Sequence, residues 1–170
     1  MNRAEPEMIE LGQFLAAFNE ESDRGAALVA AAMLDERLEQ VLRAFFLKTR
    51  ASEDLLSGFS APLGTFAARA AAAHALGLIQ SNEFEEITII RKIRNEFGHE
   101  WQPVPFESGR VADLCKRLPW LGPAEHEKSA NCRARFNMAV AILLTDLMWR
   151  VRLVAKERRE ERRWANKARA

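Results

Sequence analysis

The residues best suited to chemistry in this sequence are gathered in one segment, RKIRNEFGH, at residues 91–99. Arg94 stands there within the pattern of an apolar helix face, and His99 follows five residues later. A guanidinium can hold an anion, and an imidazole titrates near neutral pH and can transfer a proton. Arg94 and His99 therefore form either a catalytic pair or a structural clasp.

The position of Arg94 on its helix demands a partner. At about 100° per residue, Arg94 projects between Ile87 and Ile90, which belong to the apolar face. A guanidinium keeps its proton, and leaving it unpaired in a dry site would cost on the order of several kcal/mol. We therefore expect Arg94 to meet a carboxylate, a set of carbonyls, a partner subunit or a phosphate. The carboxylates expected near this face are Glu83, Glu86 and Asp23.

Gly98 decides where His99 lies. A glycine after the last apolar residue suits a left-handed cap at the helix end, which would let His99 swing back toward Arg94. The alternative is that His99 donates a hydrogen bond to the carbonyls freed at that end. The pattern predicts in either case that the helix stops at Gly98.

The elements that must position this segment are all predicted to be helices. The sequence has no β-type alternation of any length, no tyrosine and many alanines. Its 170 residues, 48% of them hydrophobic, suit one well-buried domain. We expect an all-α, single-domain bundle of about five to seven helices over residues 1–155, followed by a basic helical extension over residues 156–170.

Apolar periodicity and turn residues set the expected helices. Ser22 or Asp23 is expected to cap the long second helix, Pro62 to begin the third and Gly77 to end it. The last helix is expected to begin near Glu127 or Ser129. The predicted ranges are about 7–18, 23–48, 62–76, 81–98, 111–118 and 127–155.

The balance of charge argues against a surface that is positive overall. Lysines and arginines number 25 against 24 aspartates and glutamates, so bulk attraction to nucleic acid is not expected. The tail KERREERRWANKARA, residues 156–170, carries a local positive excess. It is either a solvated end of the chain or a segment that adds electrostatic attraction to a partner.

The residue pattern does not support metal binding, cofactor binding or a membrane span. Cys115 and Cys132 give neither a disulfide framework nor a metal spacing. The acidic residues at 35, 36 and 39 lack a histidine at ligand spacing, which favours a solvated or salt-bridged face. No apolar run approaches the roughly twenty residues of a membrane span, and no signal segment is evident. We expect a cytoplasmic protein with no metal, no cofactor and no membrane contact.

Three segments together resemble the mannitol operon repressor family of bacterial helical proteins. They are SDRGAALVAAAMLDERLEQVL at 22–42, GFSAPLGTFAARAAAAHALGLI at 58–79 and EFEEITIIRKIRNEFGH at 83–99. The resemblance implies an all-helical cytoplasmic transcriptional regulator that forms a homodimer and acts through protein or nucleic-acid contacts, without catalytic turnover. No helix-turn-helix with a basic recognition helix is evident in the sequence.

In that interpretation, a surface around the helix of Arg94 binds the partner. The candidate binding residues are Asp23, Arg24, Arg91, Arg94 and Trp101. Asp23 and Arg24 could instead cap the long helix and pair locally. Trp101 and Phe106 could stack on a base or form a loop lid over the core.

A second resemblance is shorter. Arg94, Asn95 and His99 match the arginine, polar residue, three-residue spacer and histidine of HEPN-type ribonucleases. That resemblance implies a dimer that cleaves RNA through the 2′-hydroxyl without a metal, as a toxin or defence component. Arg94 would hold the scissile phosphate, His99 would move a proton and Asn95 would orient one of them. The longer resemblance favours a regulator over an enzyme, and the ribonuclease stays the alternative.

Overall fold

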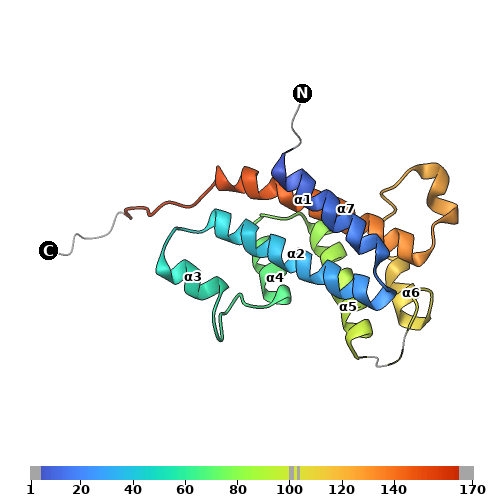
Figure 1. Cartoon of the computed structure of the whole chain (residues 1–170). Coiled ribbons are helices and arrows are strands. Elements are labelled where there is room, and N and C mark those ends of the chain that lie inside the picture. The colour runs from blue at the N-terminus through green and yellow to red at the C-terminus, as the bar shows by residue number, and fades with distance from the viewer. Residues whose placement is uncertain (1–4, 100–101, 103, 165–170) are drawn as a thin grey trace.

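The chain folds into an all-α bundle (Figure 1). The computed structural model describes residues 5–99, 102 and 104–164, and those residues contain no β-strand. The predicted all-α, single-domain bundle is confirmed. The helices are α1 (Pro6–Glu20), α2 (Asp23–Phe45), α3 (Arg50–Leu56), α4 (Phe66–Ala75), α5 (Ser81–His99), α6 (Gly109–Lys116), the 3-10 helix η1 (Ala124–Ser129) and α7 (Cys132–Ala155).

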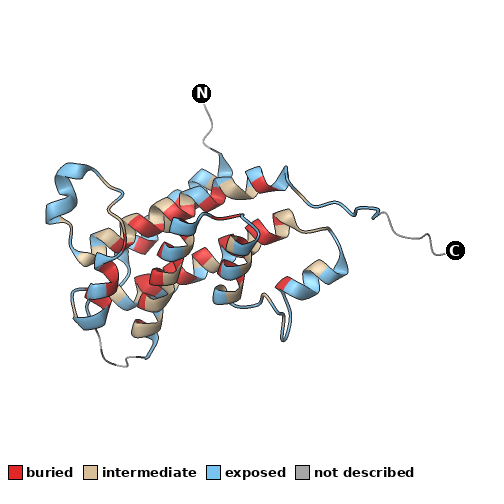
Figure 2. Cartoon of the chain, turned by 180° about the vertical axis from the view of Figure 1, so that it is seen from behind, coloured by how far each residue is buried: buried red, intermediate tan, exposed pale blue. Residues whose placement is uncertain are grey.

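Helix α2 is the central element of the bundle. It packs against α7, α4 and α5, and the buried faces of these helices meet around it (Figure 2). Leu34, Leu38 and Leu42 of α2 are fully buried and form an apolar stripe along one side of the helix. Ser22 caps its N-terminus, because the Ser22 hydroxyl accepts a hydrogen bond from the amide of Gly25 at 3.1 Å.

Helix α4 ends as its glycine predicts. Gly77 has φ +70°, and the amide of Leu78 donates to the carbonyl of Ala73 at 2.8 Å. The amide of Gly77 also donates to the carbonyl of His74 at 2.9 Å, which completes a Schellman motif. This turn directs the chain from α4 into α5, whose buried face supports the candidate site.

Two helices begin at other residues than predicted, and one helix was not predicted. Helix α4 begins at Phe66 rather than Pro62, because the Thr65 side chain caps it by accepting from the amide of Ala68 at 3.2 Å. Helix α7 begins at Cys132, where Asn131 is the cap and accepts from the amide of Ala134 at 2.7 Å. Helix α3 was not expected, because its seven residues are too few to show a clear period.

The expected helical extension is not helical over its described part. Helix α7 ends at Ala155, and residues 158–164 have no regular structure. The tail instead folds back toward the end of α2. Arg158 donates to the carbonyls of Arg43 and Phe46 at 3.1 and 2.8 Å, and the amide of Arg159 donates to the carbonyl of Phe45 at 2.8 Å. Arg158 and Arg159 therefore bind to carbonyls at the end of α2 and do not extend α7 by another turn.

A membrane span is not found in the described part of the chain. None of the helices there combines the length and the apolar character that crossing a bilayer requires.

Candidate functional site

An open cavity of about 510 Å³ lies between α2, α4 and α5. Helix α5 contributes Arg91, Arg94 and Asn95, so the cavity brings together three of the residues singled out in the sequence. Within the described part of the chain, neither Arg91 nor Arg94 forms an ion pair. The other lining residues are Leu28, Ala31, Ala32, Asp35, Thr65, Phe66 and Ala67.

Arg94 is exposed, which corrects the expectation of a dry site. Its Nη1 donates to Oδ1 of the neighbouring Asn95 at 3.2 Å. The apolar face of α5 is otherwise buried as predicted, with Ile87, Ile90 and Ile93 fully enclosed. Arg94 escapes burial because the helices beside it leave the open cavity instead of a packed interface. Water can therefore solvate its charge.

The predicted left-handed cap at Gly98 is wrong. Helix α5 continues through His99, and Gly98 has no positive φ. Phe97 is buried, and its ring centroid lies 5.0 Å from that of Phe106. This packing fixes the last turn of α5, so the helix continues although glycine would permit it to end. His99 is exposed and does not line the cavity. Five residues along a helix also place Arg94 and His99 about 140° apart around the axis, so this chain does not bring them together.

The carboxylates proposed as partners of Arg94 are engaged elsewhere. Glu83 is buried and accepts from Nη2 and Nη1 of Arg150 at 2.7 and 3.1 Å, and from the amide of Gln80 at 2.6 Å. Asp23 pairs with Arg133 at 2.9 Å. Glu86 lines a different cavity, of about 350 Å³, beside α7. The ion-pair interpretation of Arg94 is therefore wrong for all of them.

The carboxyl group of Glu86 on α5 has a raised pKa. Burial raises its pKa to about 6, and the negative charges of Glu83, Asp146 and Glu85 act in the same direction. The raised pKa of Glu86 makes the stability of the fold sensitive to pH.

The remaining candidate binding residues have mixed outcomes. Asp23 is part of a clasp that holds the fold together, because its Oδ2 also accepts from the amide of Phe106 at 3.0 Å. Arg24 is exposed in the first turn of α2. Phe106 is fully buried against Phe136, at a ring distance of 4.8 Å, which confirms the lid over the core for that residue. Trp101 lies outside the described residues.

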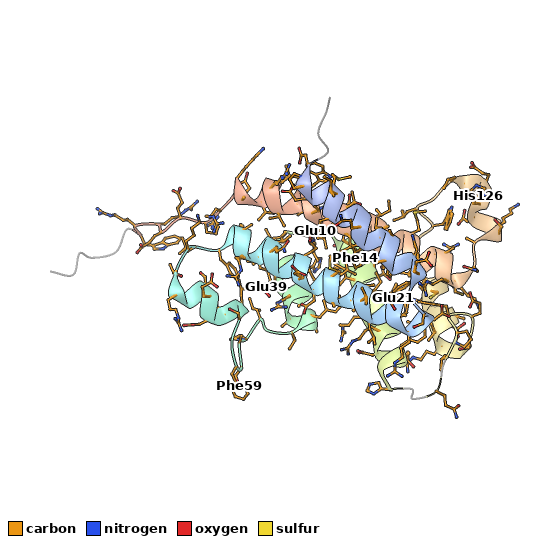
Figure 3. The ribbon with its side chains drawn as sticks, viewed as in Figure 1. Glu10, Phe14, Glu21, Glu39, Phe59 and His126 are labelled. Atoms are coloured by element: carbon orange, nitrogen blue, oxygen red, sulfur yellow. The ribbon has the colours of Figure 1, made fainter. Side chains whose placement is uncertain are left out.

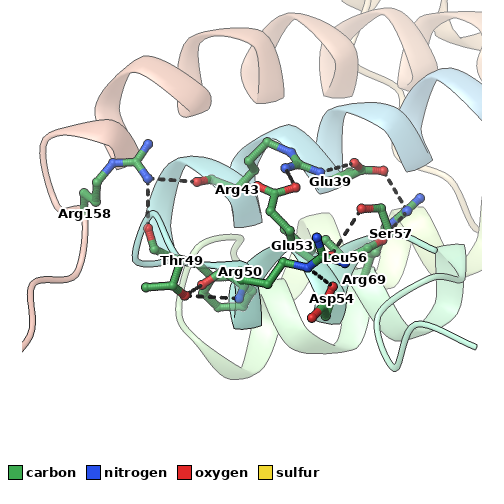
Figure 4. Close-up of polar contacts among 12 residues, drawn as sticks. Glu39, Arg43, Thr49, Arg50, Glu53, Asp54, Leu56, Ser57, Arg69 and Arg158 are labelled. Carbon is green, nitrogen blue, oxygen red and sulfur yellow. Dashed lines mark hydrogen bonds and ion pairs between the residues drawn. The ribbon is translucent and has the colours of Figure 1, made fainter.

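Arg69 organises the wall of the cavity and was not identified from the sequence. It is buried, and its Nη1 lies 2.9 Å from the carboxylate of Asp35. Its Nη2 lies 2.7 Å from the carboxylate of Glu39 (Figure 4). Its Nη2 also donates to the carbonyl of Leu56 at 3.1 Å. The salt-bridged face predicted for the acidic residues of α2 is therefore confirmed at Asp35 and Glu39. The available signal was an arginine inside an alanine-rich helix together with two acids one turn apart.

Neither a group of metal ligands nor a reactive thiol is evident among the described residues. Within the described residues, no three side chains of histidine, cysteine, aspartate or glutamate are grouped so as to hold a metal ion. Cys115 and Cys132 are free thiols, and burial raises the pKa of Cys115 to about 12. A thiol held in its protonated form is a poor nucleophile.

Comparisons with known proteins give a likeness of fold. No protein-family model matches the chain, and no curated protein matches its sequence. The X-ray structure of the MtlR-HPr complex from Escherichia coli contains a similar chain, at 23% identity and a TM-score of 0.57. The match covers 83% of the present chain and 97% of that chain. The protein therefore has an MtlR-like fold.

Proposed function

We propose that this protein is a cytoplasmic regulator of the mannitol operon repressor type that acts by binding a partner protein. The observation that carries the proposal is the fold match, which covers 97% of the length of a chain from the MtlR-HPr complex. The resemblance of residues 22–42, 58–79 and 83–99 to the same family supports it independently of the structure. A homodimer is part of the proposal and follows from the family resemblance.

Exposed apolar side chains suggest where a protein partner binds. Ile9 of α1 and Trp149 and Leu153 of α7 are all exposed. The start of α1 lies beside the end of α7, where Arg152 pairs with both Glu5 and Glu7, and each of these helix ends carries some of the exposed apolar residues. A tryptophan beside aliphatic side chains is the kind of anchor that dominates many protein interfaces. We call Ile9, Trp149 and Leu153 the apolar patch.

The test is a calorimetric titration of the purified protein with HPr from the same organism. Saturable binding is expected, and Leu153→Ser should weaken it about tenfold or more, since an apolar anchor is lost. Phe59→Ser is the matched control, because Phe59 is fully exposed at the tip of the loop between α3 and α4, away from the apolar patch (Figure 3). Absence of HPr binding would refute this choice of partner.

Two further measurements address the other contacts. Sedimentation equilibrium should give twice the monomer mass if the protein is a homodimer. Gel mobility of DNA and RNA at low salt tests direct nucleic-acid contact, for which the arginines of residues 158–163 supply the charge. An unchanged mobility would assign the protein to partner binding alone.

The second candidate function is metal-independent cleavage of RNA. It is favoured by the exposure of Arg94 and His99 near the end of α5, where a second copy could approach both. Labelled RNA should be cut in excess chelator by the wild type and left intact by Arg94→Ala and His99→Ala at equal folding. Intact RNA with the wild type would remove this candidate.

A further inference from the structure

The cavity between α2, α4 and α5 carries an unbalanced positive charge. Arg91 and Arg94 stand three residues apart on α5, so their side chains leave the same side of the helix. The one acidic lining residue, Asp35, lies 2.9 Å from Arg69, which also pairs with Glu39, so the two cations of α5 face a single carboxylate that already has a partner. Both guanidiniums of α5 therefore remain available to an anion.

The first turn of α4 adds hydrogen-bond donors to the same cavity. Thr65 uses its hydroxyl for the amide of Ala68 and its carbonyl for the amide of Arg69. In the described part of the chain, the amides of Phe66 and Ala67 have no acceptor, and both residues line the cavity. Unpaired amides and the helix dipole at such an end favour a bound anion.

The rest of the lining is mostly apolar, which favours a ligand that carries an apolar group besides its charge. Leu28, Ala31 and Ala32 of α2 lie in the lining together with the Phe66 side chain. A volume of about 510 Å³ is in the range of small-molecule sites. The ligand that fits is a small anion with an apolar body rather than an inorganic ion alone.

We propose that this cavity binds a small phosphate monoester, with Arg91, Arg94 and the first amides of α4 holding the phosphate and the α2 wall holding the organic group. A phosphate monoester offers three terminal oxygens and close to two negative charges, which two guanidiniums and a helix end can share. A carboxylate has two oxygens and one charge, and a single arginine fork satisfies it. The site needs no contribution from the apolar patch.

The probe is phenyl phosphate, titrated by calorimetry into the full chain at constant ionic strength. It should bind at least about tenfold more tightly than inorganic phosphate, because the ring adds apolar contact. Phenol should give no measurable heat, because it lacks the charged group. Equal affinities for phenyl phosphate and phenol would overturn the proposal.

Matched variants locate the binding. Arg91→Gln and Arg94→Gln should each weaken phenyl phosphate binding about tenfold or more, since each removes a charged donor. Arg50→Gln is the control, because Arg50 is an exposed arginine on α3 outside the cavity. Both cavity residues have solvent access, so thermal melting should show unchanged folding for all three variants. Unchanged affinity in both cavity variants would overturn the proposal.

Two competitors separate the phosphate monoester from other anions. Phenylacetate should bind at least about tenfold more weakly than phenyl phosphate, as expected for one charge in place of two. A short single-stranded RNA should not displace phenyl phosphate at equal concentration. Equal binding of phenylacetate would indicate a carboxylate site, and displacement by RNA would indicate a site for the phosphate backbone of RNA. Either result would overturn the proposal.

Discussion

The carboxylate of Asp23 and the guanidinium of Arg133 lie 2.9 Å apart, although 110 positions separate them in the sequence. Arg133 also donates to the carbonyls of Phe18 and Glu21 at 3.2 and 3.0 Å, and Asp23 accepts from the amide of Phe106. The contact thus ties the end of α1, the start of α2, the segment before α6 and the start of α7 together. Asp23 is a structural residue, and its charge is already used within the chain.

Replacing Asp23 with alanine should lower the free energy of unfolding by about 2–3 kcal/mol, because a half-buried arginine and an amide lose a charged acceptor. Urea denaturation followed by circular dichroism measures this change. Asp54→Ala is the matched control, since Asp54 pairs with Arg50 on the open surface, and such pairs contribute at most about 0.5 kcal/mol. Similar losses in the two variants would contradict the clasp.

Arg69 is expected to stabilise the fold through the planar geometry of its guanidinium as well as through its charge. Replacing it with alanine leaves Asp35 and Glu39 facing each other half-buried, and should cost about 2–4 kcal/mol. Arg69→Lys should recover less than half of that loss, because one ammonium cannot reach two carboxylates and the Leu56 carbonyl with the same geometry. Calorimetric melting of both variants gives the comparison. A lysine variant as stable as the wild type would show that charge alone suffices.

Gly98 offers a direct test of the conformation at the end of α5. A Cβ added at Gly98 meets no atom within 4 Å, and the residue is helical. Gly98→Ala should therefore raise the free energy of unfolding by about 0.5 kcal/mol, because alanine loses less backbone entropy in a helix. Gly77→Ala is the opposite control, since φ is +70° there and the change should cost about 1 kcal/mol. Destabilisation by Gly98→Ala would contradict the helical conformation and indicate a left-handed cap at Gly98.

The helices could be read from the sequence because their signals are local. The apolar stripe around Leu38 and the caps at Ser22 and Gly77 depend on residues within a few positions of one another. Gly98 shows the limit of such signals, since glycine permits a left-handed ending and the packing of Phe97 decides against it. The predicted helix start at Pro62 is wrong for a similar reason, since proline permits a start there and the side-chain cap at Thr65 decides where α4 begins.

Only some residues of the candidate site could be predicted from the sequence. Arg91, Arg94 and Asn95 were found because they share one helix. The partners of Arg69 and Arg133 were missed because each bond joins distant segments, and no periodicity reports such pairs. The exposure of Arg94 also depends on how far the neighbouring helices cover α5, which is a property of tertiary packing and not of the helical wheel.

Glu86 gives the fold its clearest expected dependence on pH. Its pKa is raised from 4.5 to about 6, mainly by burial and further by Glu83, Asp146 and Glu85, while Arg150 on α7 is bound to Glu83. The native state therefore holds this proton more tightly than the unfolded chain does. The contribution of Glu86 to stability is fully present below about pH 4.5 and is lost as the pH rises through about 6.

The loss amounts to about 2 kcal/mol, since one pKa unit corresponds to about 1.4 kcal/mol. Glu86→Gln removes it, so the variant should gain up to about that much relative to the wild type between pH 4 and pH 7.5. Urea denaturation at pH 4, 5.5 and 7.5 measures the difference. Glu20→Gln provides the control, because Glu20 is exposed at the end of α1 and lies outside the cavity that Glu86 lines. A constant difference between Glu86→Gln and the wild type across these pH values would mean that the pKa of Glu86 is the same in the native and unfolded states, so that burial does not raise it.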